Sequence, residues 1–154
     1  MAGQLLSLRD QKPIIAFVED LCCSAAYWIA SSCDSIGVST ELSVVGSIGT
    51  FTTIKNYQKK FEKEGINIVE LYATASTQKN IEYREALQGN FEKLQKDLDF
   101  YNEHFINIVV KNRPGLRENQ EWKTGKKFFA NDALKSGLID FIAPFNDFIE
   151  NILI

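Results

Sequence analysis

The sequence predicts an α/β domain built around a mostly parallel sheet. Short, solid apolar runs alternate with segments whose apolar residues recur every three or four positions, which is the pattern of strands followed by helices. The first runs come in the order strand, helix, strand, helix, strand, as expected for parallel strands joined by helical crossovers. The 154 residues, 45% of them hydrophobic, are enough to bury the core of one domain over residues 1–154.

The first half of the chain is expected to form five elements and a turn. In chain order these are strand 13–18, helix 24–32, strand 35–39, the glycine-bearing turn 44–51, helix 53–65 and strand 66–72. The first strand, PIIAFV, reads as buried on both faces because it contains no polar residue. Gly65 is expected to close the second helix, since glycine adopts the left-handed conformation that ends many helices.

The second half begins with a polar loop, residues 73–89, followed by a long helix from about Asn90 to Asn112 that Pro114 stops. One stripe of this helix is apolar and must be covered, either by the core of the domain or by another subunit. The stripe consists of Phe91, Leu94, Leu98, Tyr101, Phe105 and Ile108.

The tail is expected to add a short strand, a helix capped by Asn131 and a turn at Gly137. A last strand, residues 138–143, and a closing helix that runs to the end of the chain complete the prediction.

Composition excludes several classes of function. The formal net charge is only -3 and no long basic run occurs, so a nucleic-acid groove is not indicated. No apolar run reaches about 18 residues and no charged leader is present, so neither a membrane span nor a secretion signal is expected. Cys22, Cys23 and Cys33 lack the spaced second pair of a zinc site and are expected to be reduced thiols in or near the core.

Ser24 stands where a buried strand leads into a helix, in the run LCCSAAYWIASS. A serine held on such a turn can act as a nucleophile, because the first backbone N–H groups of the helix can stabilise an oxyanion. The small neighbours Ala25 and Ala26 would let a substrate carbonyl approach closely. Serine is also a favoured helix N-cap, and position alone favours that second interpretation.

A nucleophilic serine needs a base, and the only histidine, His104, lies inside the long helix with no acidic partner that spacing identifies. A Ser-His-Asp triad is therefore not predicted. Lysine is the next candidate, since burial can leave an amine neutral. Most lysines fall on solvated helix faces, whereas Lys79 follows the predicted third strand, near the edge where functional crevices of parallel sheets lie. An ordinary solvated loop lysine remains the alternative.

Two neighbours of Ser24 allow other interpretations. Cys23 could be read as a cysteine nucleophile, but without a nearby histidine its thiolate would be scarce. Tyr27 and Trp28 could form a substrate wall, although packing of the helix on the sheet is the favoured reading.

Three motifs together carry a family resemblance. The segments KPIIAFVEDLCCSAAYWIASSCDSIGVS, VVGSIGTF and TGKKFFANDALKSGLIDFI occur in this order over nearly the whole chain. They closely resemble the signal peptide peptidase A family of serine peptidases, including its phage minor capsid protein C branch. The resemblance implies a fold like that of the Clp protease proteolytic subunit and the crotonases, with repeated β-α units.

The resemblance also implies the roles of individual residues. Ser24 corresponds to the nucleophile, Lys79 to the general base and Ser47, in the turn Gly-Ser-Ile-Gly, to the serine that orients the lysine. The backbone N–H of Ala25 would contribute one oxyanion donor. No cofactor or metal is implied, and the expected activity is that of an endopeptidase with a Ser-Lys dyad.

The family further implies peptide or protein substrates and a homo-oligomer. It implies a cytoplasmic or phage-associated location in a bacterial host, or membrane association of a longer parent protein.

Two departures from the family pattern bear on activity. No Ser-Pro-Gly-Gly turn precedes the strand before Ser24, so the first strands and a second oxyanion donor are expected to be missing from this chain. Losing one such donor costs about 100- to 1,000-fold in rate. A catalytically inactive scaffold or assembly protein is therefore the alternative function, and a thioester-processing crotonase is not favoured. The run Asp20-Leu21-Cys22 is expected to alter the substrate pocket rather than the chemistry.

Overall fold

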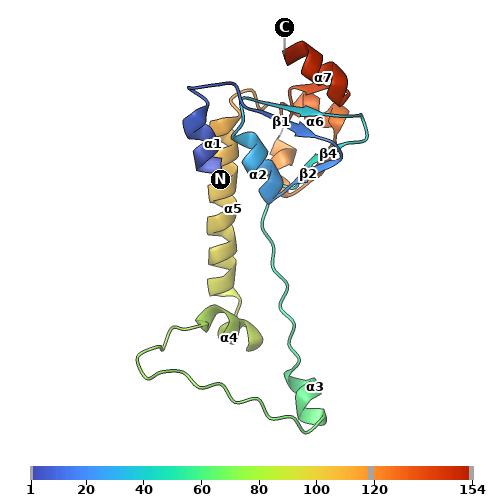
Figure 1. Cartoon of the computed structure of the whole chain (residues 1–154). Coiled ribbons are helices and arrows are strands. Elements are labelled where there is room, and N and C mark those ends of the chain that lie inside the picture. Colours follow the sequence, from blue (N-terminus) through green and yellow to red (C-terminus); the bar gives the residue numbers. More distant parts are fainter. Residues whose placement is uncertain (1, 118–119, 153–154) are drawn as a thin grey trace. The chain divides into compact units, whose positions relative to one another are not determined.

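The computed structural model describes residues 2–117 and 120–152, and the chain divides into two compact units (Figure 1). Unit 1 comprises residues 1–50 and 102–154, and unit 2 comprises residues 51–101. The last two residues of the predicted closing helix, 153 and 154, lie outside the described residues.

Unit 1 contains two three-stranded sheets whose pairings are mostly parallel, as predicted. The first sheet has the order β1-β3-β6, with all strands parallel, and consists of β1 (Ile15–Val18), β3 (Ser35–Val38) and β6 (Phe141–Ile142). The second has the order β2-β4-β5, with a parallel and then an antiparallel pairing, and consists of β2 (Leu21–Cys23), β4 (Val44–Gly46) and β5 (Lys127–Phe129).

The sequence analysis missed β2 and β4, each of which is only three residues long. The first strand is also less buried than predicted, because β1 forms an edge of its sheet and only Val18 of its four residues is buried.

Helices pack against these sheets or against one another and complete unit 1. They are α1 (Ala2–Leu8), α2 (Ala25–Ser31), the carboxyl-terminal part of α5 (Glu92–Asn112), the 3-10 turn η1 (Gln120–Thr124), α6 (Ala130–Ser136) and α7 (Phe145–Ile152). The long helix therefore ends at Asn112, two residues before Pro114, as predicted.

Helix α2 is anchored in the core of unit 1 by its two aromatic residues. Tyr27 is completely buried, and its hydroxyl donates a 2.7 Å hydrogen bond to the carbonyl oxygen of Leu138. The Trp28 ring stacks on Phe105 of α5, with 4.8 Å between the ring centroids. These contacts confirm that the two side chains serve packing, because they join α2 to α5 and to the segment that precedes β6.

Helix α6 ends as predicted but begins differently. Gly137 terminates the helix with a φ of 77°, and a Cβ at this position would lie 2.4 Å from the carbonyl oxygen of Gly115. The predicted cap at Asn131 is wrong. The helix starts directly after β5, so Phe129 takes the N-cap position without a side-chain cap and Asn131 falls inside the first turn.

Unit 2 contains α3 (Gln58–Lys63), α4 (Ile81–Leu87) and the first part of α5. Helix α3 is shorter than predicted, although Gly65 follows it in the expected left-handed conformation with a φ of 71°. The strand predicted at residues 66–72 is absent, and the described residues 51–101 contain no strand at all. Without a neighbouring strand, the backbone N–H and C=O groups of residues 66–72 have no partners for a sheet ladder. Helix α4 forms instead within the predicted polar loop.

The apolar stripe of the long helix is covered only in part. Phe105 is buried in unit 1, whereas Phe91 and Tyr101 are 55% and 60% exposed. Core packing therefore accounts for the carboxyl-terminal end of the stripe and not for the rest.

Candidate active site

Ser24 has a backbone conformation that L-residues rarely adopt. It follows β2 directly and has φ and ψ angles of 55° and -124°. Such a conformation costs of order 1–3 kcal/mol and is held only where the surrounding structure enforces it. At Ser24 the enforcing contacts are two backbone bonds: its N–H donates to the carbonyl oxygen of Gly46 (2.8 Å), and its own carbonyl accepts from the N–H of Trp28 (3.0 Å).

The hydroxyl of Ser24 does not cap helix α2. Ser24 occupies the N-cap position, but no hydrogen bond from its side chain to the first turn is present, and the residue is exposed. The strained φ and ψ angles turn the side chain away from the position that a capping serine takes. The capping interpretation is therefore wrong, and the hydroxyl is open to another role.

Ser47 lies beside Ser24 at the same edge of the second sheet. Cys23 and Gly46 are register partners in the parallel strands β2 and β4, so the next residue of each strand is a serine. Ser47 also has a positive φ of 52°, and its N–H donates to the carbonyl oxygen of Lys126 at 2.8 Å. The carboxyl ends of two neighbouring parallel strands therefore present two serines, at the place where α/β sheets form their functional crevices.

Gly46 makes this arrangement of two serines achievable. Its φ is 106°, and a Cβ at this position would lie 2.9 Å from the carbonyl oxygen of Lys126. Any other residue would push β5 away from β4 and would disturb the carbonyl that accepts the N–H of Ser24.

Ala25 and Ala26 form the first turn of α2 and are exposed. The first backbone N–H groups of a helix have no acceptor within the helix. Small side chains beside these donors leave room for a carbonyl oxygen, so the arrangement suits the oxyanion role that the family resemblance gives to Ala25.

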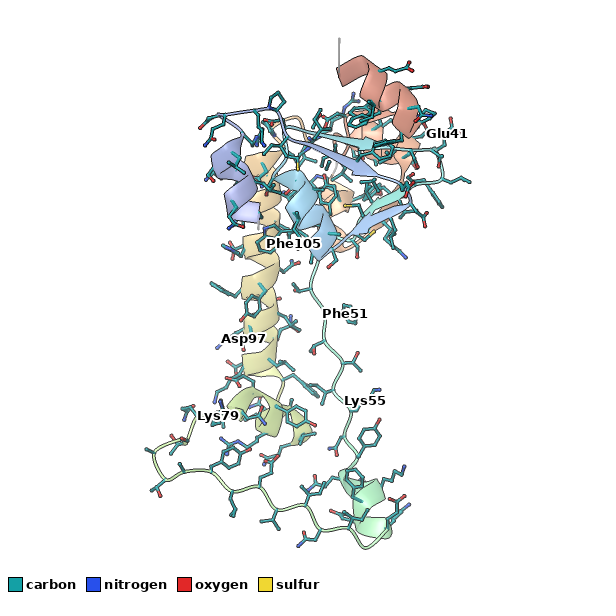
Figure 2. All side chains as sticks on the ribbon, in the orientation of Figure 1. Glu41, Phe51, Lys55, Lys79, Asp97 and Phe105 are labelled. Carbon is teal, nitrogen blue, oxygen red and sulfur yellow. The ribbon has the colours of Figure 1, made fainter. Side chains whose placement is uncertain are left out.

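Lys79 belongs to unit 2, whereas Ser24, Ala25 and Ser47 belong to unit 1. Figure 2 shows Lys79 on the loop that precedes α4. Its N–H donates to the carbonyl oxygen of Ser76 at 3.1 Å, and the next residue, Asn80, has a φ of 57° and stands at the N-cap of α4. Lys79 is exposed within the described structure.

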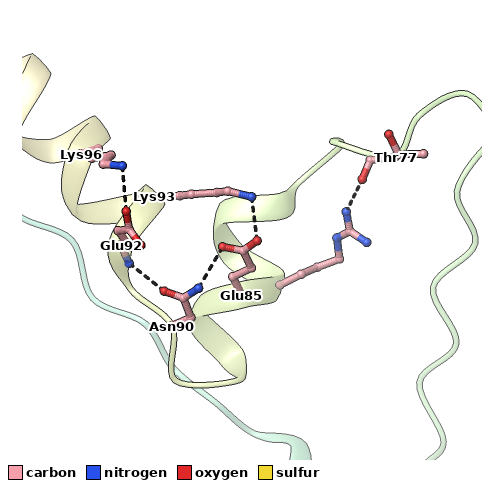
Figure 3. Close-up of polar contacts among 7 residues, drawn as sticks. Thr77, Glu85, Asn90, Glu92, Lys93 and Lys96 are labelled. Carbon is pink, nitrogen blue, oxygen red and sulfur yellow. Dashed lines mark hydrogen bonds and ion pairs between the residues drawn. The ribbon is translucent and has the colours of Figure 1, made fainter.

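The loop that carries Lys79 is tied to α4 by Arg84. The guanidinium of Arg84 donates a 2.8 Å bond to the carbonyl oxygen of Thr77 and lies 4.7 Å from the centroid of the Tyr72 ring. Figure 3 shows the bond to Thr77, together with the ion pair at 2.7 Å between Lys93 and Glu85 that joins α4 to the start of α5. The position of Lys79 relative to α4 is therefore defined by specific contacts.

The three cysteines are free thiols, and Cys22 and Cys33 are buried, as predicted. Burial raises the pKa of Cys22 to about 11 and raises the pKa of Cys23 as well, although the charge of Lys127 opposes the second shift. A protonated thiol is a poor nucleophile, so the cysteine interpretation of Cys23 is not supported. His104 packs against the Trp28 ring, 5.6 Å between centroids, which is consistent with a packing role.

The described residues contain no group of three or more potential metal ligands. None of their helices combines the length and the apolar character that a membrane crossing requires.

Residues 7–152 match the model of peptidase family S49. The chain belongs to this family. A relative described as the probable protease SohB of Buchnera aphidicola subsp. Schlechtendalia chinensis is 31% identical over 150 residues, which are 96% of this chain and 48% of the relative. The S49 match confirms the resemblance read from the three sequence motifs.

Two solved structures confirm the fold. A membrane-bound stomatin-specific protease aligns with 97% of this chain and 60% of its own at a TM-score of 0.56 and 13% identity. An enoyl-CoA hydratase/carnithine racemase from Magnetospirillum magneticum aligns with 99% of this chain and 39% of its own at a TM-score of 0.50 and 11% identity. The S49 chain thus has the fold shared by these peptidases and the crotonases, and it spans about half the length of the first curated relatives it matches.

Proposed function

We propose that this S49 protein is a serine endopeptidase that cleaves peptide bonds through an acyl-enzyme on Ser24. The observation that carries the proposal is the conformation of Ser24, whose φ of 55° and ψ of -124° hold an exposed, non-capping hydroxyl at the end of β2. A turn from strand to helix with this strain is the setting in which other hydrolases present a nucleophilic serine. Membership of a peptidase family supports the same chemistry.

The proposed base is Lys79. Its neutral amine takes the proton of the Ser24 hydroxyl as the oxygen attacks the substrate carbonyl, and then delivers this proton to the leaving amine. Water then attacks the ester carbonyl and loses a proton to the amine; the bond between the acyl carbon and the Ser24 oxygen breaks, the amine returns the proton to that oxygen, and the acid leaves. In this proposal Ser47 orients the lysine, and the N–H of Ala25 donates to the developing oxyanion.

The proposal treats residues 1–154 as one peptidase domain to which both units contribute. The S49 match supports this part of the proposal, because it runs through unit 1 and unit 2 without interruption. It includes the homo-oligomer and the peptide or protein substrates that the family resemblance implies.

Peptide turnover by four variants tests the dyad. We expect Ser24→Ala and Lys79→Ala each to abolish cleavage of a fluorogenic peptide, because each removes a group that forms or breaks a bond. The matched controls are Ser7→Ala and Lys55→Ala, which replace exposed residues of the same types and should keep the activity of the parent protein. Lys55 lies on the extended segment that leads to α3 (Figure 2).

A small fluorophosphonate probe separates the nucleophile from the base. It should label the parent protein at Ser24 and leave Ser24→Ala unlabelled, whereas Lys79→Ala should label slowly. Full labelling and turnover by Lys79→Ala would remove the lysine from the mechanism, and a parent protein that neither labels nor cleaves would favour the scaffold alternative.

A further inference from the structure

A cavity of about 510 Å³ lies in unit 1, where helix α5 ends. Residues of α5, of the loop that follows it and of η1 line this basic cavity, and three of them are cations: Arg113, Arg117 and Lys123. The volume falls in the range of about 300–1,000 Å³ that is common for small-molecule sites. None of the lining residues is a candidate catalytic residue, and no acidic residue is among the described residues that line it.

Arg113 gives the basic cavity a fixed positive group. Its side chain is only 7% exposed, and its two terminal nitrogens are held by Asp140 and by the carbonyl oxygen of Gly137. Its Nε is buried and has no hydrogen-bond partner within the described structure. A buried donor without a partner is rare in proteins, and bound water or a bound ion is a common explanation for one. The orphan Nε therefore points to a ligand at this cavity independently of the charge.

Arg117 and Lys123 add positive charge to the basic cavity. Neither forms an ion pair with another of the described residues. The Lys123 amine lies 5.2 Å from the centroid of the Trp122 ring, which is almost completely buried. The backbone N–H of Arg117 donates a 3.2 Å bond to the carbonyl oxygen of Ser136, which ties the loop after α5 to α6. The two charges are therefore held at the cavity by packing and backbone contacts, and both can pair with an anion.

The sequence around the basic cavity concentrates positive charge in an acidic protein. Residues 111–127 include six lysines and arginines against two glutamates, whereas the whole chain has a formal net charge of -3. A local excess of one sign of charge raises the concentration of oppositely charged ligands nearby. Because the cations line one cavity and form no long basic run, they suit a small anion better than the extended backbone of a nucleic acid.

We propose that the basic cavity binds the phosphate group of a small phosphomonoester. Arg117 and Lys123 donate to the phosphate oxygens, and Arg113 contributes a third, immobile cation. Phosphate suits this set better than a carboxylate, because its charge of about -2 matches two cations without acidic partners and its oxygens accept several charge-assisted hydrogen bonds. Val110 and Leu116 also line the cavity and provide apolar contacts for the organic part of the ligand. The proposal is independent of the peptidase function, because it uses none of the residues assigned to that function.

Isothermal titration calorimetry with phenyl phosphate tests the proposal. The parent protein should bind this probe, and the double variant Arg117→Gln with Lys123→Gln should bind it at least tenfold more weakly, because two charge-assisted contacts are lost. The matched control is Lys59→Gln with Lys63→Gln, which removes two positive charges from exposed positions of α3 and should keep the affinity of the parent. Equal weakening in the two double variants would overturn the proposal, because it would show a general attraction by charge instead of a site.

Further probes define the ligand. Inorganic phosphate should bind more weakly than phenyl phosphate, because it lacks a group for the apolar walls, and benzoate should bind at least tenfold more weakly than phenyl phosphate. Benzoate that binds equally well would overturn the choice of phosphate. A parent protein that binds neither phosphate probe would overturn the site. If that protein still sediments with vesicles that contain phosphatidic acid, and not with vesicles of phosphatidylcholine alone, the small-molecule ligand is overturned in favour of a lipid headgroup.

Discussion

The two units of this chain differ in how many of their strands are paired and how many of their apolar side chains are buried within the unit. Unit 1 pairs its strands into two sheets and buries apolar side chains from both of them, including the fully buried Ile36 of β3 and Val45 of β4. Within the described residues 51–101, by contrast, Ala86 is the single buried apolar residue, and Leu71 is 91% exposed. The comparison teaches that the same kind of apolar run becomes a strand only where a neighbouring strand is available.

The candidate catalytic residues belong to different units. The proposed nucleophile Ser24 is built into the unit that has a core, and the proposed base Lys79 lies in a loop of the unit that has almost none. A precise position for Ser24 therefore follows from sheet geometry, whereas the position of Lys79 depends on polar contacts such as the bond from Arg84 to Thr77.

The largest expected effect on stability is that of removing a tyrosine ring from unit 1, compared with removing one from unit 2. Tyr27→Ala deletes a completely buried ring and its bond to Leu138, and it should lower the free energy of unfolding by about 3–5 kcal/mol. Tyr83→Ala removes a ring of unit 2 that is 37% exposed, and it should cost less than about 1 kcal/mol. Urea unfolding followed by circular dichroism measures both.

An equal loss of stability in the two tyrosine variants would contradict the comparison, since it would mean that unit 2 is packed as tightly as unit 1. Tyr27→Phe provides a finer control, because it keeps the ring and should lose only about 1 kcal/mol with the hydrogen bond.

Several elements of unit 1 could be predicted from the sequence, whereas the lack of a strand in unit 2 could not. The run PIIAFV, the long helix and the left-handed Gly137 each carry a local signal, and each forms, although the strand covers only Ile15–Val18 and is less buried than predicted. The run INIVELY carries an equally strong strand signal but forms none, because strand formation depends on a partner that local sequence does not reveal. Similarly, the sequence identified Ser24 and Ser47 but not their adjacency, which depends on the unpredicted pairing of β2 with β4.

A smaller effect is expected from the half-buried ion pair between Arg113 and Asp140 in unit 1. Arg113, only 7% exposed, donates two 2.8 Å bonds to Asp140 and one of 3.1 Å to the carbonyl oxygen of Gly137. Arg113→Met should cost about 2 kcal/mol, below the 3–5 kcal/mol of a fully buried pair, because Asp140 remains partly solvated.

The matched control for Arg113→Met is Lys126→Met, which breaks the exposed ion pair between Lys126 and Glu121. Exposed pairs contribute about 0–1 kcal/mol, so the two unfolding curves should be clearly separated. Overlapping curves would show that the Arg113 contacts contribute little to the closure of unit 1.

The smallest expected effect is a change in the pH dependence of stability. The backbone N–H of Ile14 and the side chain of Arg9 hold the pKa of Asp34 below its ordinary value of 3.8. Since the folded-state pKa is the lower one, this stabilisation is fully present above pH 3.8 and is lost as the pH falls through the folded-state value. Asp34→Asn should therefore flatten the acid limb of a plot of thermal midpoint against pH, and an unchanged acid limb would contradict this role of Asp34.

The left-handed backbone at Ser24 and Ser47 implies a conflict between stability and activity. Glycine would occupy both positions without the steric cost that a Cβ brings there, so the chain gives up folding free energy to keep two hydroxyl groups. A library selected only for thermostability would therefore be drawn toward Ser24→Gly and Ser47→Gly and would lose the candidate active site as it improved. Engineering of this protein should hold both positions fixed and seek added stability in unit 2, where large exposed apolar residues leave the most room for gain.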